Sequence, residues 1–408
     1  MGHTPQPHMI DYFKGKTVFV TGGSGFVGGR LVEVLVRDCG AKVRALVHNP
    51  GGALRMARFD IDFVFADMTD EAAMTKATQG CDFIFHCAFG KNGTDQEQWH
   101  ATVEGTRALA VAALKNGTNR LVNLSTAAVY GDTPDSEIDE TYPRNPGTWH
   151  YAKMKLAGEK VLEDLRKREP LPFTTLQLVG VYGPWGEVFT VGPLRQLAKS
   201  RVVLVNDGTG FVNATYVDDV VQAMLRAAMK PEAVGEFFLI KGAGRVTRRQ
   251  FYEAYEHMLG VKALASMTPV EIAAHRRAAS RDNLRQLLPQ AARALRYDTA
   301  FRQAFSDSAA GSTFQSLRPW LSAGLVAKLK GESVTPTNPP PTTDAPTDAR
   351  PLILPQEFMV RRLGAKTEFS SRKAERLLDY KPAFELARGM ALTEQWARWA
   401  KLIPDRVS

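Results

Sequence analysis

Cysteine, long apolar runs and metal-ligand patterns are all scarce in this sequence. Its 408 residues include 3 cysteines with no close-spaced pair, so we expect neither a disulfide framework nor a zinc site. The 8 histidines are scattered without metal-ligand spacing. No apolar run approaches the ~18 residues of a membrane span, and residues 1–8 lack the basic start and apolar segment of a signal peptide. We therefore predict a protein of the reducing cytoplasm, with no bound metal.

The composition is that of an ordinary globular protein with an excess of positive charge. Hydrophobic residues make up 44% of the chain and charged residues 23%, and its length suits one large α/β domain with extra elements or two domains. A formal net charge of +9 suits an acidic ligand or a membrane surface, or it serves solvation alone. Because no recognised nucleic-acid-binding module accompanies the charge, we expect no nucleic-acid partner.

One stretch rich in glycine, Thr21-Gly-Gly-Ser-Gly-Phe-Val-Gly28, predicts a dinucleotide site. It follows an apolar run at 17–20 that is typical of a buried strand, and it leads into 29–37, whose apolar spacing is typical of a helix packed on a sheet. Glycines there let a pyrophosphate approach the main chain, and the start of the helix supplies free N–H donors. The alternative is an ordinary structural turn. The predicted cofactor contacts in this stretch are Gly22, Ser24, Gly25, Phe26, Val27 and Gly28.

The end of the second predicted strand, 42–48, bears on the choice between NAD and NADP. An acidic residue about 20 residues beyond the glycines would bind the adenosine ribose of NAD, but Val47 and His48 stand there. The missing carboxylate removes repulsion toward a 2′-phosphate, which favours NADP with His48 against the cofactor. We expect basic side chains nearby to pair with that phosphate. In the alternative the cofactor is NAD and these basic residues are only solvated. Those residues are Arg44, Arg55 and Arg58.

Two further predicted strands, 61–66 and 82–86, end in residues that we place at the cofactor. The carboxyl ends of parallel strands meet at one edge of a sheet, where open α/β folds bind ligands. Asp67 either accepts a hydrogen bond from the adenine amino group or caps a helix that begins near Thr69. The predicted cofactor contacts at these two ends are Asp67, Met68 and Ala88.

A tyrosine and a lysine four residues apart, Tyr151 and Lys155, are the strongest indication of catalysis. On a helix they lie on one face, about a turn from each other. A neighbouring ammonium and a nicotinamide cation would favour the phenolate, so such a tyrosine can exchange a proton with an alcohol or a carbonyl during hydride transfer. A helix at 96–116 leads to a fifth strand at 120–124, which brings hydroxyls to the same sheet edge at Ser125-Thr126.

Taken together, these motifs resemble the extended short-chain dehydrogenase/reductase superfamily, which includes NAD-dependent sugar epimerases and dehydratases, dihydroflavonol reductases and 3β-hydroxysteroid dehydrogenases. The resemblance covers about 15–260 and about 367–400. It implies an α/β fold with a Rossmann-type doubly wound parallel sheet, a smaller C-terminal substrate domain and a helical insertion. The motifs that carry it are Thr21-Gly-Gly-Ser-Gly-Phe-Val-Gly28, Asp67, Ser125-Thr126, Val129-Tyr-Gly131, Tyr151 with Lys155, Val181-Tyr-Gly-Pro184 and Tyr216-Val-Asp-Asp219.

The resemblance implies catalytic roles for Thr126, Tyr151 and Lys155. Tyr151 would be the general acid/base and Lys155 would lower its pKa and bind the ribose. Thr126 would orient the reacting oxygen, with Ser125 as the alternative. Thr102 stands where the family often has an asparagine, which puts a structural or proton-relay contact in doubt. Dimers built from two long helices per subunit are frequent in similar proteins, so we expect a homodimer.

Two departures from the nucleotide-sugar enzymes bear on the substrate. Those enzymes usually carry an asparagine and an arginine that contact the nucleotide diphosphate, where this chain has Gly180 and Val212. Both segments are more similar to the hydroxysteroid dehydrogenase branch. We therefore predict an NAD(P)-dependent oxidoreductase acting on a small steroid-like, alicyclic or sugar alcohol or ketone. The alternatives are a nucleotide-sugar epimerase or dehydratase and a non-catalytic dinucleotide-binding scaffold.

The chain is predicted to have five segments. Residues 1–14 form a tail, and 15–261 form the NAD(P)-binding domain with part of the substrate domain. Residues 262–330 are an arginine-rich insertion that acts as a lid, makes peripheral contact with a membrane, or forms a helical subdomain with a solvated basic face. Residues 331–356, rich in proline and threonine, form a linker, and 357–408 complete the substrate domain.

Overall fold

The computed structural model of the chain describes residues 6–279, 281 and 350–404. The chain divides into two compact units, one made of Met1–Ser266 with Pro351–Ser408 and the other of Met267–Arg350. Most of the predicted insertion and linker lies outside the described residues, so the five-segment division and the roles given to those segments stay predictions. In the part of the chain that is described, no helix combines the length and the apolar character needed to cross a bilayer.

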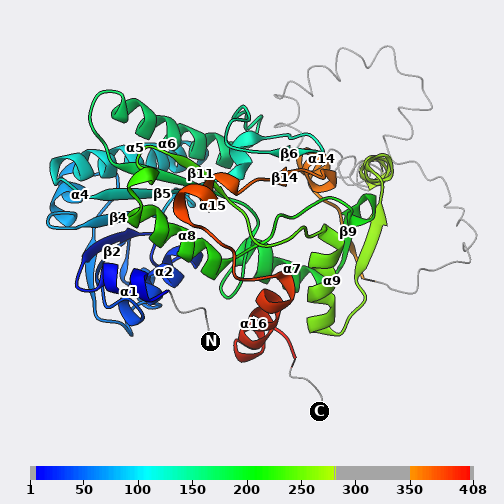
Figure 1. Cartoon of the computed structure of the whole chain (residues 1–408). Helices are drawn as coiled ribbons and strands as arrows, with labels where there is room; N and C mark the ends of the chain where they lie inside the picture. Colours follow the sequence, from blue (N-terminus) through cyan, green and yellow to red (C-terminus); the bar gives the residue numbers. More distant parts are fainter. Residues whose placement is uncertain (1–5, 280, 282–349, 405–408) are drawn as a thin grey trace, which may run out of the picture. The chain divides into compact units, whose positions relative to one another are not determined.

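A seven-stranded parallel sheet forms the centre of the first unit (Figure 1). Its order is β11-β7-β5-β4-β1-β2-β3, and neighbouring strands run parallel throughout. The chain order reverses between β1 and β4, which is the switch point where open α/β sheets bind ligands. The strands are β1 (Thr17–Thr21), β2 (Lys42–Val47), β3 (Ile61–Phe65), β4 (Phe83–His86), β5 (Arg120–Thr126), β7 (Phe173–Leu178) and β11 (Phe237–Ile240).

Helices cover both faces of this sheet because its strands are apolar on both sides. In β1, Val18 and Val20 pack on one face while Phe19 packs on the other, and all three are fully buried. Figure 1 shows α2 and α8 on the first face and α4, α5 and α6 on the second. The helices are α1 (Pro7–Phe13), α2 (Phe26–Arg37), α4 (Glu71–Ala77), α5 (Asp95–Lys115), α6 (His150–Arg166) and α8 (Val217–Met229).

Smaller sheets and the carboxyl-terminal segment build the remainder of this unit. β8 (Val181–Tyr182) pairs with β10 (Thr215–Tyr216), and β6 (Glu137–Ile138) pairs with β14 (Glu368–Phe369). A separate apolar cluster, the cluster of the substrate side, joins β8 and β10 to α7 (Gly192–Lys199), α9 (Arg248–Leu259) and α16 (Leu386–Trp399). Two further helices are α14 (Val360–Gly364) and α15 (Arg372–Leu378), of which α15 packs on the core of the large sheet. A three-stranded sheet contains β9 (Arg201–Val205), β12 (Leu264–Met267) and β13 (Leu352–Ile353).

The predicted Rossmann-type fold is confirmed, and boundaries differ from the predicted ones by only a few residues. The predicted helix at 96–116 is α5, which begins one residue earlier because Thr94 and Glu97 form a reciprocal capping box. The fifth strand continues past 124 to Thr126, so it carries both hydroxyls of the Ser125-Thr126 pair. These residues therefore lie at the carboxyl edge of the sheet, on the element that pairs with β4 and β7.

Candidate active site

The turn between β1 and α2 brings its backbone so close together that side chains do not fit. Gly22 has a φ of +69°, and a Cβ on Gly28 would lie 2.3 Å from the carbonyl oxygen of Gly22. A Cβ on Gly22 would itself lie 2.8 Å from the backbone nitrogen of Ala88. The predicted cofactor contacts Gly22, Gly28 and Ala88 are thus neighbours in space at the switch point of the sheet.

The start of α2 offers unused hydrogen-bond donors to an anion. Gly25 is the N-cap residue and supplies no side-chain cap, and the first turn, which begins with Phe26 and Val27, contains no acidic residue. Exposed Ser24 precedes this turn. A close-packed glycine turn followed by an uncapped helix start suits a diphosphate, because N–H groups and the helix dipole both favour negative charge. These residues fit the phosphates of a dinucleotide.

Of the three arginines predicted near a 2′-phosphate, Arg44 is engaged elsewhere. Its Nε donates to Asp62 Oδ2 at 2.7 Å and its Nη1 donates to the Ala77 carbonyl at 2.6 Å. Its prediction as a phosphate partner is wrong, because the strand period turns this side chain onto the β2–β3 surface under α4. Arg58 lies over the Phe59 ring and 3.7 Å from a carboxylate oxygen of Glu33.

Arg55 lies beside the glycine turn. Its Nη1 donates to the carbonyl oxygen of Gly25, and its guanidinium carbon lies 4.8 Å from the centre of the Trp185 ring. A Cβ on Gly29 would be 2.7 Å from this carbon, so the guanidinium rests directly on the first turn of α2. Burial lowers the pKa of Arg55 to about 10, and the guanidinium forms no ion pair with a carboxylate within the described ranges. An anionic ligand would offset this unfavourable burial.

Asp67 forms a local turn and does not cap a helix. Its Oδ1 accepts hydrogen bonds from both the backbone nitrogen and the hydroxyl of Thr69, each at 2.9 Å, and these bonds lower the pKa of Asp67. The following helix α4 is capped by Asp70, which accepts from the backbone nitrogen of Ala73 at 3.0 Å. The capping alternative for Asp67 is therefore wrong, because the helix begins two residues later than predicted. Its contact with adenine stays a prediction.

Two other predicted contacts occupy the same edge of the sheet. Met68 follows β3, and its side chain packs so closely on α5 that a Cβ on Gly105 would lie 2.5 Å from Met68 Cε. The backbone nitrogen of Ala88 donates to the Thr21 hydroxyl at 3.2 Å, which fixes the loop after β4 to the end of β1. His48 lies one residue past β2 and is exposed.

The predicted catalytic residues are brought together at the end of β5 and the start of α6. The Tyr151 phenol faces the Thr126 hydroxyl, which favours its ionised form, and Lys155 follows one helical turn later and is 7% exposed. The Thr126 hydroxyl also accepts from the backbone nitrogen of Ala128 at 3.2 Å, which holds it in place. Sequence spacing alone predicted the Tyr151–Lys155 pair, while the contact with Thr126 required the fold.

Burial controls the proton affinity of these groups. It raises the pKa of Tyr151 to about 12, although the bond with Thr126 acts in the opposite direction. It lowers the pKa of Lys155 to about 8, against the attraction of Glu159. The predicted lowering of the Tyr151 pKa is therefore not a property of these side chains by themselves. The phenol in the protein alone is protonated near neutral pH.

Several residues that sequence reasoning missed surround this group. His86 is buried between the hydroxyls of Thr21 (2.9 Å) and Thr106 (3.0 Å), and burial lowers its pKa to about 3, so its ring is neutral. The Thr102 hydroxyl, which replaces the usual asparagine, accepts from the Gly90 backbone nitrogen at 2.9 Å and donates to the Gln98 carbonyl. Thr102 thus positions the loop after β4. Sequence reasoning could have identified His86 as a site residue, because it stands at the end of a predicted strand, where such sheets bind ligands.

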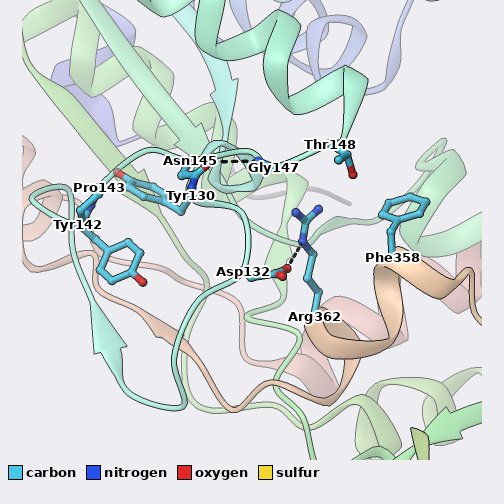
Figure 2. A pocket seen from close by; sticks show the side chains of 9 residues that line it. All are labelled: Tyr130, Asp132, Tyr142, Pro143, Asn145, Gly147, Thr148, Phe358 and Arg362. Atoms are coloured by element: carbon cyan, nitrogen blue, oxygen red, sulfur yellow. Dashed lines mark hydrogen bonds and ion pairs between the residues drawn. The ribbon is translucent and has the colours of Figure 1, made fainter.

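A pocket of about 430 Å³ lies beside the start of α6. Figure 2 shows Asp132 and Arg362 in direct contact in its lining, with the Arg362 Nε donating to Asp132 Oδ1 at 2.9 Å. The Arg362 guanidinium also lies 5.2 Å from the centre of the Trp149 ring, and that ring is 5.6 Å from the ring of Tyr151. The lining residues are Tyr130, Asp132, Tyr142, Pro143, Asn145, Gly147, Thr148, Phe358 and Arg362.

The two departures noted at 180 and 212 have a common structural cause. Gly180 has a φ of +48°, and a Cβ there would lie 2.7 Å from the carbonyl oxygen of Val212. Val212 is itself buried in the apolar cluster of the substrate side. The backbone is therefore packed too closely at position 180 for the asparagine of the nucleotide-sugar enzymes. Position 212 lies in an apolar core, where a phosphate-binding arginine would need open space.

Comparison with known proteins gives relatives both among the hydroxysteroid dehydrogenases and among the nucleotide-sugar epimerases. A family model described as NAD dependent epimerase/dehydratase family matches residues 18–240. The chain is 29% identical over 280 residues to the 4-hydroxy-2-methyl-3-oxo-4-farnesyl-3,4-dihydroquinoline-1-oxide ketoreductase of Stigmatella aurantiaca, covering 67% of this chain and 82% of that one. It is 30% identical over 246 residues to the 3beta-hydroxysteroid-dehydrogenase/decarboxylase isoform 1 of Arabidopsis thaliana, covering 55% of each.

Among solved structures, the fold is similar to that of a UDP-glucose 4-epimerase from Thermotoga maritima. The TM-score is 0.63 at 20% sequence identity, over 94% of this chain and 99% of that one. At this identity the likeness shows the fold alone.

The glycine turn generates a test of the cofactor site. Gly28→Ala would place a methyl group 2.3 Å from the Gly22 carbonyl oxygen, so the turn must move and dinucleotide affinity should fall at least about tenfold. Titration calorimetry with NADP and with NAD measures this. Gly158→Ala is the matched control, because its Cβ would meet only the Thr106 hydroxyl at 3.4 Å. Unchanged affinity in Gly28→Ala would contradict the assignment.

Proposed function

Because the chain belongs to the NAD dependent epimerase/dehydratase family, we propose that it is an NAD(P)-dependent oxidoreductase that interconverts a secondary alcohol and its ketone. Tyr151 is the general acid/base, Thr126 orients the reacting oxygen, and Lys155 binds the ribose and supplies positive charge. The observation that carries this proposal is that the Tyr151 phenol faces the Thr126 hydroxyl at the end of β5, with buried Lys155 one turn further along α6.

These side chains suit ketone reduction. The nicotinamide supplies or accepts the hydride when it is bound. Because burial raises the pKa of Tyr151 to about 12, its phenol holds a proton near neutral pH and can donate it to a carbonyl oxygen. Thr126 holds the phenol in place for this transfer. The rings of Phe89 and Trp149 lie 5.4 Å and 5.6 Å from the Tyr151 ring and pack against it from two sides.

NADP is the proposed cofactor, and Arg55 is its proposed phosphate partner. The support is the position of this guanidinium on the first turn of α2, where it is half-buried and forms no ion pair within the described part of the chain, although the charge of Glu33 acts on it. A half-buried cation of this kind is stabilised by a phosphate. NAD remains the alternative, since the glycine turn serves either dinucleotide.

The proposed substrate is an apolar ring-bearing or prenylated ketone or its alcohol. Val212 is buried where a diphosphate would need a cation, and Arg362 is already paired with Asp132 in the pocket near Trp149. The Stigmatella relative is named as a ketoreductase of a farnesylated dihydroquinoline, which is such a molecule. The alternative of a nucleotide-sugar epimerase is supported by the presence of Arg362 in the pocket. A scaffold without turnover is disfavoured, because a binding protein needs no proton donor.

Replacing the phenol tests the mechanism. Tyr151→Phe should reduce kcat at least about 100-fold while NADP binding stays largely intact, because only the transferable proton is lost. Turnover is followed by the absorbance of reduced nicotinamide, and binding by calorimetry. Tyr12→Phe, at an exposed site on α1, is the control. Turnover unchanged in Tyr151→Phe would overturn the mechanism.

The cofactor choice is tested at Arg55. Arg55→Gln should weaken NADP binding about 10- to 100-fold and NAD binding much less, because a charge-assisted contact to the 2′-phosphate is lost. Arg37→Gln, on the exposed last turn of α2, should bind both as the wild type does. Wild-type protein that binds NAD about tenfold more tightly than NADP would exclude the NADP assignment.

The substrate class is tested by direct competition between the two candidates. With NADPH present, 3-ketosteroids and a farnesylated quinoline ketone should be reduced, while UDP-glucose is neither converted nor bound. A Phe358→Ala variant should raise KM for the apolar ketones, because Phe358 lines the pocket and contacts Trp149. Epimerisation of UDP-glucose without net consumption of reduced cofactor would favour the alternative.

A further inference from the structure

Four titratable residues recur every four positions along one face of α6, and the proposed mechanism uses only the first two. They are Tyr151, Lys155, Glu159 and Glu163, at successive turns of the helix. Lys155 is 7% exposed and Glu159 is fully buried. A buried carboxylate is costly unless it is hydrogen-bonded or paired, so its place directly behind the lysine calls for a reason.

The surroundings of Glu159 are built for a carboxylate. Its Oε2 accepts from Arg144 Nη1 at 2.9 Å, and its Oε1 accepts from Gln177 Nε2 at 3.0 Å. Gln177 is oriented in turn by Tyr130, whose hydroxyl donates to Gln177 Oε1 at 2.6 Å. Arg144 is itself held by Glu163, which accepts from its Nη2 at 2.8 Å. Donors from β7 and from the loop before α6 thus fix both oxygens of Glu159.

Lys155, by contrast, is surrounded by groups that carry no charge near neutral pH. His86 of β4 is neutral, because burial and the charge of Lys155 lower its pKa to about 3. Burial raises the pKa of the Cys87 thiol and of the Tyr151 phenol, each to about 12. Of the titratable groups that act on Lys155 in the described part of the chain, only Glu159 is available as an anion.

We propose that Glu159, held by Arg144 and Gln177, is a positioning residue that fixes a negative charge one turn of α6 beyond Lys155 and so keeps the Lys155 ammonium charged. This inference rests on the proposed function, because it assigns Glu159 a task only through Lys155. Glu159 itself touches neither the reacting oxygen nor the cofactor.

The charges fix the sign of the effect. Burial lowers the pKa of Lys155 to about 8, and the attraction of Glu159 is what opposes it most. Burial also raises the pKa of Glu159, while Arg144 and Gln177 favour its ionised form. Removing the carboxylate charge should lower the pKa of Lys155 further, so that the lysine loses its proton at a lower pH than in the wild type.

Glu159→Gln tests this without knowledge of the substrate. In the NADP complex labelled with [13Cε]lysine, the Lys155 signal, assigned by its loss in Lys155→Met, should titrate about one pH unit lower than in the wild type. Glu163→Gln is the matched control, because Glu163 lies on the next turn of the same face and also binds Arg144, and its midpoint should not move. An unchanged midpoint in Glu159→Gln would overturn the inference.

A second variant keeps the test decisive if Glu159→Gln does not fold. Glu159→Met also removes the charge and fills the space with an apolar side chain, so it must give the same downward shift. Glu159→Asp retains the charge, and its midpoint should stay closer to the wild-type value than that of Glu159→Met. Equal midpoints in Glu159→Met and Glu159→Asp would contradict the proposal.

Kinetics separate this inference from the proposed function. With NADPH and a 3-ketosteroid or the farnesylated quinoline ketone, the ratio of wild-type to Glu159→Gln kcat should grow as pH rises through the range in which the variant lysine loses its proton. A merely structural role would give a ratio independent of pH. If Tyr151→Phe kept its turnover, the proposed function would fail. If Tyr151→Phe were inactive while the ratio stayed constant with pH, only the role of Glu159 would fail.

Discussion

The approach of the carbonyl oxygen of Gly22 to Gly28, so close that no Cβ fits there, is the constraint on which this site depends. It brings the end of β1 directly against the first turn of α2, at the point where the sheet reverses its strand order. Because no side chain fits there, the N–H groups of the helix start remain available to an anion, and the loop after β4 can close in from the other side. The positions of Ala88 and Arg55 follow from this packing.

Buried charge is the second organising feature, and it is distributed over distant parts of the chain. Arg30 of α2 pairs with Asp218 of α8 at 2.6 Å, which joins the cofactor helix to the helix after β10. Asp219 accepts hydrogen bonds from the backbone nitrogens of Ala383 and Phe384, which ties the carboxyl-terminal segment to the same helix. Glu159 and Arg144 likewise join α6, one turn beyond Lys155, to the loop that precedes it. Each of these interactions holds in place an element that carries part of the site. The buried charges therefore contribute more to the geometry of the site than to the stability of the fold.

Much of the fold and half of the site could be predicted from sequence, because local patterns encode them. Strand and helix periods gave the order of the Rossmann elements, and helical spacing put Tyr151 and Lys155 on one face. Arg44 was misassigned because proximity in sequence to a strand end says nothing about which face of the strand a side chain takes. The capping alternative for Asp67 was wrong because two aspartates stand within four residues, and only the observed backbone shows that Asp70 caps α4.

The sequence by itself determined the family, the glycine turn between β1 and α2 and the pairing of Tyr151 with Lys155, since each depends on residues close together in the chain. Tertiary structure decided the rest. It placed Thr126 against Tyr151, closed Val212 over Gly180, set Arg55 on the start of α2 and surrounded Glu159 with donors from two other elements. These contacts join segments tens to hundreds of residues apart, and their energies depend on burial, which a single sequence does not display.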